Sequence, residues 1–507
     1  MTARLHQTKA ARDGRRRRPA LLRLPVLALV LPLTACAVGP DFVPPSAPHA
    51  QRYTARPTPT SIRSTRRQGD QEIRLGHSIS DTWWTVYKAP ALDVVLKQAI
   101  ADSPTLTAAR ATLAQAREGV AVAAGGLYPQ LDLGARAARQ RGTASGVTGT
   151  SVGNLYSLSA DAGYSLDVFG GIRRNVEQQR ALADVSRYEL AAAWLTLTGQ
   201  SVSQALTIAS TSAQIRAVRE IIDADGRNLA LVREKYQAGK AARVDVITAE
   251  TSLASDQILL PPLQQQRDTA RHALTMLIGH TPGEWSPPAF RLHDFTLPPQ
   301  VPLSLPSSLV RQRPDILAAE ARLHAASAAI GVATANLYPS FTLSASLGQQ
   351  SGATGTLFDS ASRFWNLALS PLQPLFHGGA LRADKRAAVD AYRASLASYR
   401  QTVLTGFQQV SDSLRALSHD AELIDAQTTL LDNASSSLEL QRISYRAGKS
   451  DLLQLLDAQR SYARARLGYI QASTQRLQDT ASLIVAMGGG WWHSAAAGAT
   501  DAASAAR

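Results

Sequence analysis

The chain has 507 residues, a formal net charge of +14, 45% hydrophobic residues and 18% charged residues. Its single cysteine excludes a disulfide framework and any cysteine-cluster metal site, and its scattered histidines form no metal-binding tract. No apolar run reaches the ~20 residues of a membrane-spanning helix, so a helical membrane protein is not expected.

The positive charge gives little support for nucleic-acid binding. Half of the net charge lies in the first 35 residues, which include the run from Arg15 to Arg18. The remaining excess is spread along the predicted helices, apart from a cluster between Arg52 and Arg74. We therefore expect no nucleic-acid partner.

The N-terminus has the layout of an export signal. The basic run precedes an apolar stretch from Leu21 to Leu33, and small residues follow. Residues 33–36, Leu-Thr-Ala-Cys, resemble the bacterial lipobox, so 1–35 is predicted to be a lipoprotein signal peptide. Cys36 would then carry S-diacylglycerol and an N-palmitoyl group, which anchor a protein stably to a bilayer. Ala37 favours sorting to the outer membrane, and the alternative is an ordinary signal peptide with an incidental cysteine.

The body of the chain is a tandem repeat with an offset of about 210 residues. Leu-Tyr-Pro at 127–129 recurs at 337–339, and Ala-Gly-Lys at 238–240 recurs at 447–449. The order of the shared motifs is the same in both halves, which indicates an internal duplication. We expect a first repeat over 96–280, a linker with equatorial residues over 281–312, and a second repeat over 313–490.

Each repeat contains one predicted β-hairpin, over 131–167 and over 340–373. Apolar and polar residues alternate there with a period of two, and the loops are expected near 142–153 and 348–361. The strand length and the strongly polar second face favour membrane strands over a half-buried soluble hairpin. Aromatic residues at the strand ends could form interfacial girdles: Tyr128, Phe169, Tyr338, Phe364, Trp365 and Phe376.

Four strands are too few to close a barrel. An open sheet in lipid would leave the backbone groups of its edge strands without hydrogen bonds. Membrane strands therefore require oligomerisation, and three protomers would supply twelve strands.

Long helices follow each hairpin. No proline interrupts the chain from Ile172 to about Ala238, and this stretch corresponds to a helix of roughly 100 Å. Apolar residues recur at spacings of three and four, with Asp225 at one position of the seam, as in coiled coils. The helices should reverse at tips near 238–245 and 447–454, and Pro261-Pro262 should interrupt the first returning helix.

Several ordered motifs identify a family. They are Cys36–Phe42, Trp83-Trp84, Arg311–Ile316, Tyr445–Gly448, Leu455–Gln459 and Met487–Trp491. Together they resemble the TolC-type outer-membrane efflux channels, in the lipoprotein branch, over about residues 30–492. The resemblance implies a mostly α protomer with a membrane β part.

In that fold, four strands per protomer build a trimeric 12-stranded barrel, and coiled-coil-like helices build a periplasmic α-barrel. The segment 36–95 would carry the lipid and part of the equatorial region, and 491–507 would be a disordered tail. The resemblance also implies a homotrimer in outer-membrane lipid, a periplasmic adaptor protein and an inner-membrane pump of the resistance-nodulation-division type.

The resemblance assigns a gate to the second tip. Asp457 matches an aspartate ring near the periplasmic mouth, and Leu453 matches an adjacent apolar ring. Tyr445 and Arg446 match residues that pair with neighbouring helices and hold the mouth shut. The alternatives are a solvated surface acid at Asp457 and ordinary packing at Tyr445 and Arg446.

The two tip turns are expected to contact the adaptor. They contain Gly239 and Lys240 in the first repeat, and Gly448 and Lys449 in the second. The alternative is that these residues only reverse the helices.

The predicted function is a passive duct that exports small molecules, such as drugs and toxic compounds, from a pump to the exterior. A type I protein-secretion duct on the same fold is the first alternative, and a lipid-anchored coiled-coil scaffold is the second. An enzyme is not expected, because no nucleophile–base constellation, H-E-x-x-H motif or phosphate loop occurs. No catalytic residue, metal or cofactor is predicted apart from the covalent lipid.

Overall fold

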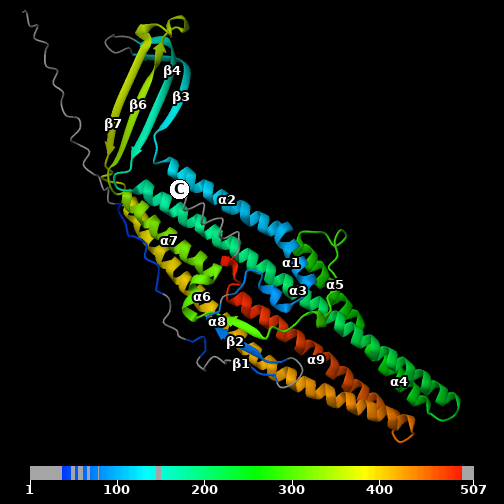
Figure 1. Ribbon diagram of the computed structural model, residues 1–507. Coiled ribbons are helices and arrows are strands. Elements are labelled where there is room, and N and C mark those ends of the chain that lie inside the picture. Colours follow the sequence, from blue (N-terminus) through cyan, green and yellow to red (C-terminus); the bar gives the residue numbers. More distant parts are fainter. Residues whose placement is uncertain are drawn as a thin grey trace, which may run out of the picture.

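The computed structural model describes residues 37–46, 52–54, 61–64, 69–77, 79–143 and 150–493. The protomer is elongated, with a β-sheet at one end and long helices that run from it to the opposite end (Figure 1). Cys36, the predicted signal peptide and residues 494–507 lie outside the described residues.

Helices dominate the described chain. They are α1 (Pro90–Asp102), α2 (Pro104–Gly125), α3 (Gly171–Gln237), α4 (Arg243–Gln257), α5 (Leu260–Ile278), α6 (Pro306–Gln312), α7 (Pro314–Ala335), α8 (Ala380–Arg446) and α9 (Leu452–Ala486). The strands are β1 (Ser61–Ile62), β2 (Gln71–Leu75), β3 (Gln130–Thr143), β4 (Thr150–Leu166), β5 (Gln300–Leu303), β6 (Ser340–Ser351) and β7 (Arg363–Leu372). Short 3₁₀ helices include η2 (Trp83–Tyr87) and η6 (Trp491–His493).

The four predicted membrane strands form one antiparallel sheet in the order β3-β4-β6-β7. The strands are longer than predicted, because pairing continues through Gly142 opposite Ser151 and through Gln350 opposite Ser157. The expected loops at 142–153 and 348–361 therefore begin too early. Glycine, serine and threonine lowered the apparent strand tendency there, but the ladder supplies partners for their backbone groups.

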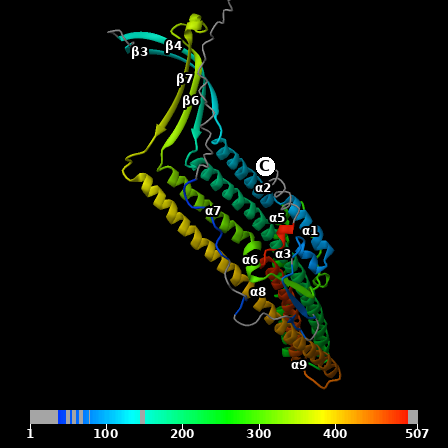
Figure 2. The same ribbon diagram turned by 60° about the vertical axis from the view of Figure 1, so that its left-hand side comes forward.

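The two longest helices, α3 and α8, have 67 residues each and lie at equivalent positions of the two repeats. Together with α2 and α7 they form a layer in the order α2-α3-α7-α8 below the sheet, as Figures 1 and 2 show. The first returning helix is broken between Gln257 and Leu260, next to Pro261-Pro262, whereas α9 runs unbroken for 35 residues.

A mixed region surrounds the helices near their middle. Its three-stranded sheet, β1-β2-β5, comes from segments on either side of the first repeat. Trp83, Trp84 and Tyr87 are buried in the main hydrophobic core there, and the hydroxyl of Tyr87 donates to the carbonyl oxygen of Leu477 at 2.9 Å. The equatorial region is thereby packed directly against α9.

The predicted disordered tail over 491–507 begins too early, because residues 491–493 form η6. Trp491 begins η6 and is 8% exposed. Its indole N–H donates to the carbonyl oxygen of Gln312 at 2.8 Å, so burial and a hydrogen bond hold it in place. Residues 494–507 lie outside the described residues.

Among the described residues, one helix is long and apolar enough to cross a membrane by length and composition, namely α7. This helix contains Asp315, Glu320 and Arg322, so it is not an uninterrupted apolar run. The most apolar 18-residue stretch of α7 is 56% buried inside the protein, where the helix packs between α3 and α8. Its apolar character is thus used for packing between the long helices.

Candidate conduit and its periplasmic mouth

The sheet has one apolar face and one polar face. On the apolar face, Leu133, Leu347 and Trp365 are largely exposed in the protomer. On the other face, Asp132, Asp161 and Ser346 lie opposite one another across three strands. Asp161 accepts hydrogen bonds from the hydroxyls of Ser159 and Ser346. One face therefore suits lipid and the other suits water, as expected for membrane strands.

A glycine on the polar face makes room for an aromatic ring. Gly348 lies opposite Phe364 in the pairing of β6 with β7. A Cβ atom at Gly348 would lie 2.8 Å from the ring of Phe364 and would also meet the carbonyl oxygen of Leu158. The ring of Phe364 therefore packs against the backbone of β6 at Gly348.

The first described residues dock at the junction between sheet and helices. The amide of Val38 donates to the carbonyl oxygen of Phe169 at 3.0 Å, just after β4 ends. Ala37 lies directly against Gly170, where any Cβ atom would be 2.7 Å from the Cα of Ala37. The predicted lipidation residue, Cys36, lies outside the described residues but precedes this docked position by one residue.

Arg174 on α3 fastens this N-terminal segment. It is nine-tenths buried, and its guanidinium donates to the carbonyl oxygen of Val38 at 3.2 Å and to the carboxylate of Asp41 at 2.7 Å. It also donates to Glu177 at 2.7 Å. Burial raises the pKa of Glu177, but hydrogen bonds from Arg174 and His324 outweigh that effect and hold the pKa below its ordinary value.

Two glycines allow the same segment to lie close to α7. A Cβ atom at Gly39, which has φ +98°, would lie 2.5 Å from the Cα of Gly331. Phe42 then stacks on His324 of α7 with 4.4 Å between the ring centroids. The segment therefore bridges α3 and α7 just below the sheet.

The two tips have the same turn. Gly239 and Gly448 have φ values of +73° and +69°. The amides of Lys240 and Lys449 donate back to the carbonyl oxygens of Lys235 and Ser444, respectively, which closes the helix ends. No atom lies within 4 Å of a Cβ built on either glycine. The turns are therefore exposed and accessible at the end of the protomer farthest from the sheet (Figure 1).

Leu453 and Asp457 share one face of α9, because they are one helical turn apart. Leu453 is 60% exposed, and the carboxylate of Asp457 is exposed with the guanidinium of Arg460 at 3.6 Å. The structure thus places both predicted gate residues on an open face near the second tip.

Tyr445 has a different environment from the other gate candidates. It is buried in a small apolar cluster that includes Leu229 and Leu456. The ammonium of Lys235 on α3 lies 4.1 Å from the centroid of its ring. Tyr445 therefore joins the two helical hairpins within the protomer, whereas the neighbouring Arg446 is exposed.

The Arg311–Ile316 motif is visible in the sequence, but the contacts of Arg313 are visible only in the structure. Arg313 is buried and donates to the carbonyl oxygen of Ala486 at 2.7 Å, to Gln409 at 2.7 Å and to both carboxylate oxygens of Asp315. It therefore connects the start of α7 with α8 and the end of α9. The signal in the sequence is Arg-Pro-Asp, in which proline starts the helix and an acidic residue lies in its first turn.

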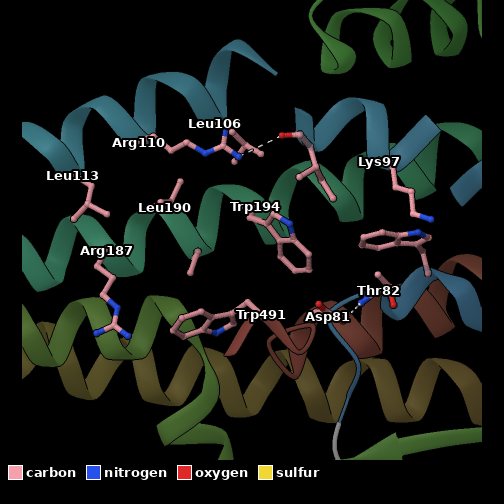
Figure 3. A pocket seen from close by; sticks show the side chains of 13 residues that line it. Asp81, Thr82, Lys97, Leu106, Arg110, Leu113, Arg187, Leu190, Trp194 and Trp491 are labelled. Carbon is pink, nitrogen blue, oxygen red and sulfur yellow. Dashed lines mark hydrogen bonds between the residues drawn. The ribbon is translucent and has the colours of Figure 1, made fainter. Parts of the chain in front are cut away.

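An apolar cavity of about 310 Å³ lies between α2, α3 and the equatorial region. Trp194 and Trp491 lie on either side of it, and Lys97, Arg110 and Arg187 lie around it (Figure 3). It is near the middle of the helices, away from both the sheet and the tips.

Comparison with known proteins identifies the family. The sequence profile of the family described as outer membrane efflux protein matches residues 95–280 and 305–489. The chain belongs to this family. It is 33% identical over 413 residues to the pyoverdine export outer membrane protein OpmQ of Pseudomonas aeruginosa, covering 80% of this chain and 86% of that protein. It is 28% identical to the outer membrane protein OprJ of the same species, covering 93% and 96% of the two chains.

Solved structures agree with this assignment. The outer-membrane channel OprN is 28% identical, with a TM-score of 0.81 over 90% of this chain and 100% of that chain. The Campylobacter jejuni channel CmeC, at 20% identity, has the same fold with a TM-score of 0.82 over 92% of this chain and 98% of that chain. The predicted fold class is confirmed, and the chain is a non-enzymatic outer-membrane efflux channel with a periplasmic helical part.

Proposed function

We propose that the chain is the lipid-anchored, trimeric outer-membrane duct of a tripartite efflux pump. It receives small molecules from an inner-membrane pump through a periplasmic adaptor and conducts them passively to the exterior. The observation that carries this proposal is the open four-stranded sheet, with one apolar face and two unpaired edge strands in the protomer.

The edges support the trimer. β3 and β7 each have only one hydrogen-bonded neighbour among the described strands, and such edges are not stable in lipid. Pairing of β3 with β7 of another copy satisfies both edges, and three copies give the twelve strands of a closed barrel. The helices α2 and α8 form the matching edges of the layer below (Figure 2). The three-fold rotation that pairs β3 with β7 of another copy would also bring α2 of one copy against α8 of the next.

The docked N-terminal segment supports the lipid anchor. Val38 and Ala37 are fixed at the end of β4, where the sheet meets the helices. A lipid on Cys36 would then lie beside the periplasmic end of the barrel. Phe376 and Tyr128, both largely exposed near that end, suit the membrane interface.

The tip residues support the gate and the adaptor contact. In a trimer, Leu453 and Asp457 would form an apolar ring and a carboxylate ring at the mouth, and such a ring attracts cations. Tyr445 would hold the hairpins of one protomer together, and Arg446 beside it would reach a neighbouring helix. Gly239, Lys240, Gly448 and Lys449 would meet the adaptor, because both turns are exposed.

The names of related channels cover varied cargo. They include pyoverdine export, toluene efflux and antibiotic efflux. That similar ducts have different cargo supports the proposal that the pump selects the exported molecule. The resistance-nodulation-division pump type rests on the sequence resemblance alone. Nothing in the fold favours protein secretion, and a scaffold would leave the exposed apolar face of the sheet unexplained.

The experiment is to determine the mass of the purified, detergent-solubilised protein together with acyl labelling of the Cys36→Ser variant. We expect a trimer, and loss of palmitate label in the variant. A monomeric protein would refute the shared barrel, and unchanged labelling would refute the lipid on Cys36.

A further inference from the structure

Each helical hairpin contains two aspartates that face each other across its helices. Asp225 lies 12 residues before the last residue of α3, and Asp256 lies 13 residues after the first residue of α4. Asp420 lies 26 residues before the end of α8, and Asp479 lies 27 residues after the start of α9. The two antiparallel helices of a hairpin rise by the same distance per residue on either side of the turn. Residues that are equally far from the turn therefore lie at the same level, as do the two aspartates of each pair.

One member of each pair is buried without a donor. Asp225 is 2% exposed and Asp420 is 7% exposed. Among the described residues, no hydrogen bond reaches either carboxyl oxygen of Asp225 or the Oδ2 atom of Asp420. A buried carboxylate without donors is strongly disfavoured in its charged form. A protonated carboxyl, in contrast, donates a hydrogen bond to a carboxylate beside it.

We infer that each hairpin has a proton-binding site, formed by Asp225 with Asp256 and by Asp420 with Asp479, and that proton release loosens the hairpin. The bound ligand is a single proton shared by two carboxyl groups. When it leaves, two like charges face each other between packed helices and repel.

The surroundings of the first site favour the proton. Burial, followed by the adjacent carboxyl group and negative charge of Asp256, raises the pKa of Asp225 to about 7. The nearby side chain of Ser252 on α4 lowers it, and among the described residues Asp256 is the charged group that contributes to this shift.

The second site has an additional cation. Burial, followed by Asp479, raises the pKa of Asp420 to about 7, while Arg476 on α9 lowers it. Arg476 itself is fully buried and also interacts with Asp425 of α8 and with Asp70 before β2. The side chain of Gln475 donates to Asp479 at 3.0 Å. The pKa of Asp420 therefore stays raised even though the guanidinium of Arg476 is near.

The direction of the pH effect follows from these raised pKa values. Helix pairing at both sites is fully supported below the ordinary aspartate pKa and loses that support as the pH rises through about 7. Above that pH, the ratio of proton-free to protonated sites grows about tenfold per pH unit. The periplasmic hairpins should therefore loosen toward alkaline pH.

The test is an infrared titration of the purified full-length protein between pH 5 and pH 9, with the C=O stretch of protonated carboxylic acids as readout. We expect a band that fades around pH 7. It should be reduced in Asp225→Asn and in Asp420→Asn, but not in the control variants Asp223→Asn and Asp412→Asn, which change exposed acids on the same two helices. A band that is absent at pH 5, or is unchanged in both buried-acid variants, would overturn the inference.

The consequence for motion is tested in the same preparations by single-channel conductance. Conductance should rise with pH in the wild type, and this rise should be lost in the double variant Asp225→Asn/Asp420→Asn. If the double variant does not fold, Asp256→Asn and Asp479→Asn change the less buried partners and should reduce the same band. Equal pH dependence of the conductance in all folded variants would contradict a link between proton release at these sites and opening of the channel. A conducting trimer without the band would refute only the proton sites, whereas a protein that does not conduct would refute the proposed function.

Discussion

The ammonium of Lys235 lies 4.1 Å from the centroid of the Tyr445 ring, and this contact joins the first helical hairpin to the second near their tips. The ring is buried by residues of both hairpins, including Leu229 and Leu456. Opening of the mouth by separation of the hairpins would break this contact. In the gate that we propose, this contact would contribute to the closed state of the mouth.

Replacement Lys235→Met should make the mouth open more readily. The variant keeps the alkyl chain over the ring but removes a cation–π interaction of about 0.5–2 kcal/mol. The measurement is single-channel conductance in planar bilayers, where longer or larger openings are expected. Arg216→Met, which removes an exposed cation from the same helix, is the control and should behave like the wild type.

Replacement Asp457→Ala should weaken cation preference at the mouth. A ring of three carboxylates attracts cations, and an alanine ring does not. Reversal potentials in a salt gradient measure the preference. Asp457→Glu, which retains the charge, should restore it. Identical reversal potentials in the wild type and the alanine variant would remove Asp457 from the conduction path.

Replacement Arg174→Gln should release the N-terminal segment from α3. A hydrogen bond to a charged partner contributes about 1.5–3 kcal/mol where the partner is shielded, as at Glu177, and less at the exposed carboxylate of Asp41. We expect faster protease cleavage within residues 37–46 and a lower unfolding temperature. Arg180→Gln, at an exposed site on the same helix, is the control. Equal cleavage of the two variants would contradict the fastening role.

Replacement Gly348→Ala should impair assembly of the barrel. Its methyl group would meet the Phe364 ring at 2.8 Å and the backbone of β4, so the sheet would have to distort. The yield of trimer in the outer-membrane fraction measures assembly. Gly163→Ala is a matched control, because nothing lies within 4 Å of a Cβ at that position of the same sheet. Normal trimer yield for Gly348→Ala would refute the steric argument.

Local sequence patterns predicted much of this fold. The absence of proline predicted α3, which runs from Gly171 to Gln237, and the period of two predicted all four membrane strands. These features depend on neighbours along the chain. The Ala-Gly-Lys turns were visible for the same reason, because positive φ at a helix end favours glycine.

Features that depend on distant partners were not predictable. Arg174 is fixed by Val38 and Asp41, which are more than 130 positions away in the sequence. Asp225 was recognised as an acid in an apolar seam, but only the fold brings it to Asp256 and removes its donors. Trp491 was assigned to a tail because its partner, the carbonyl of Gln312, lies 179 positions earlier in the sequence.

The most direct test of the account is single-channel conductance of the purified protein in a planar bilayer, with its oligomeric mass determined in the same preparation. The account predicts a trimer with small, cation-preferring conductance steps, because three sheets are needed to close one barrel and the mouth carries acidic side chains. A monomer that conducts nothing would contradict it, since the exposed apolar face of the sheet would then have no barrel to form.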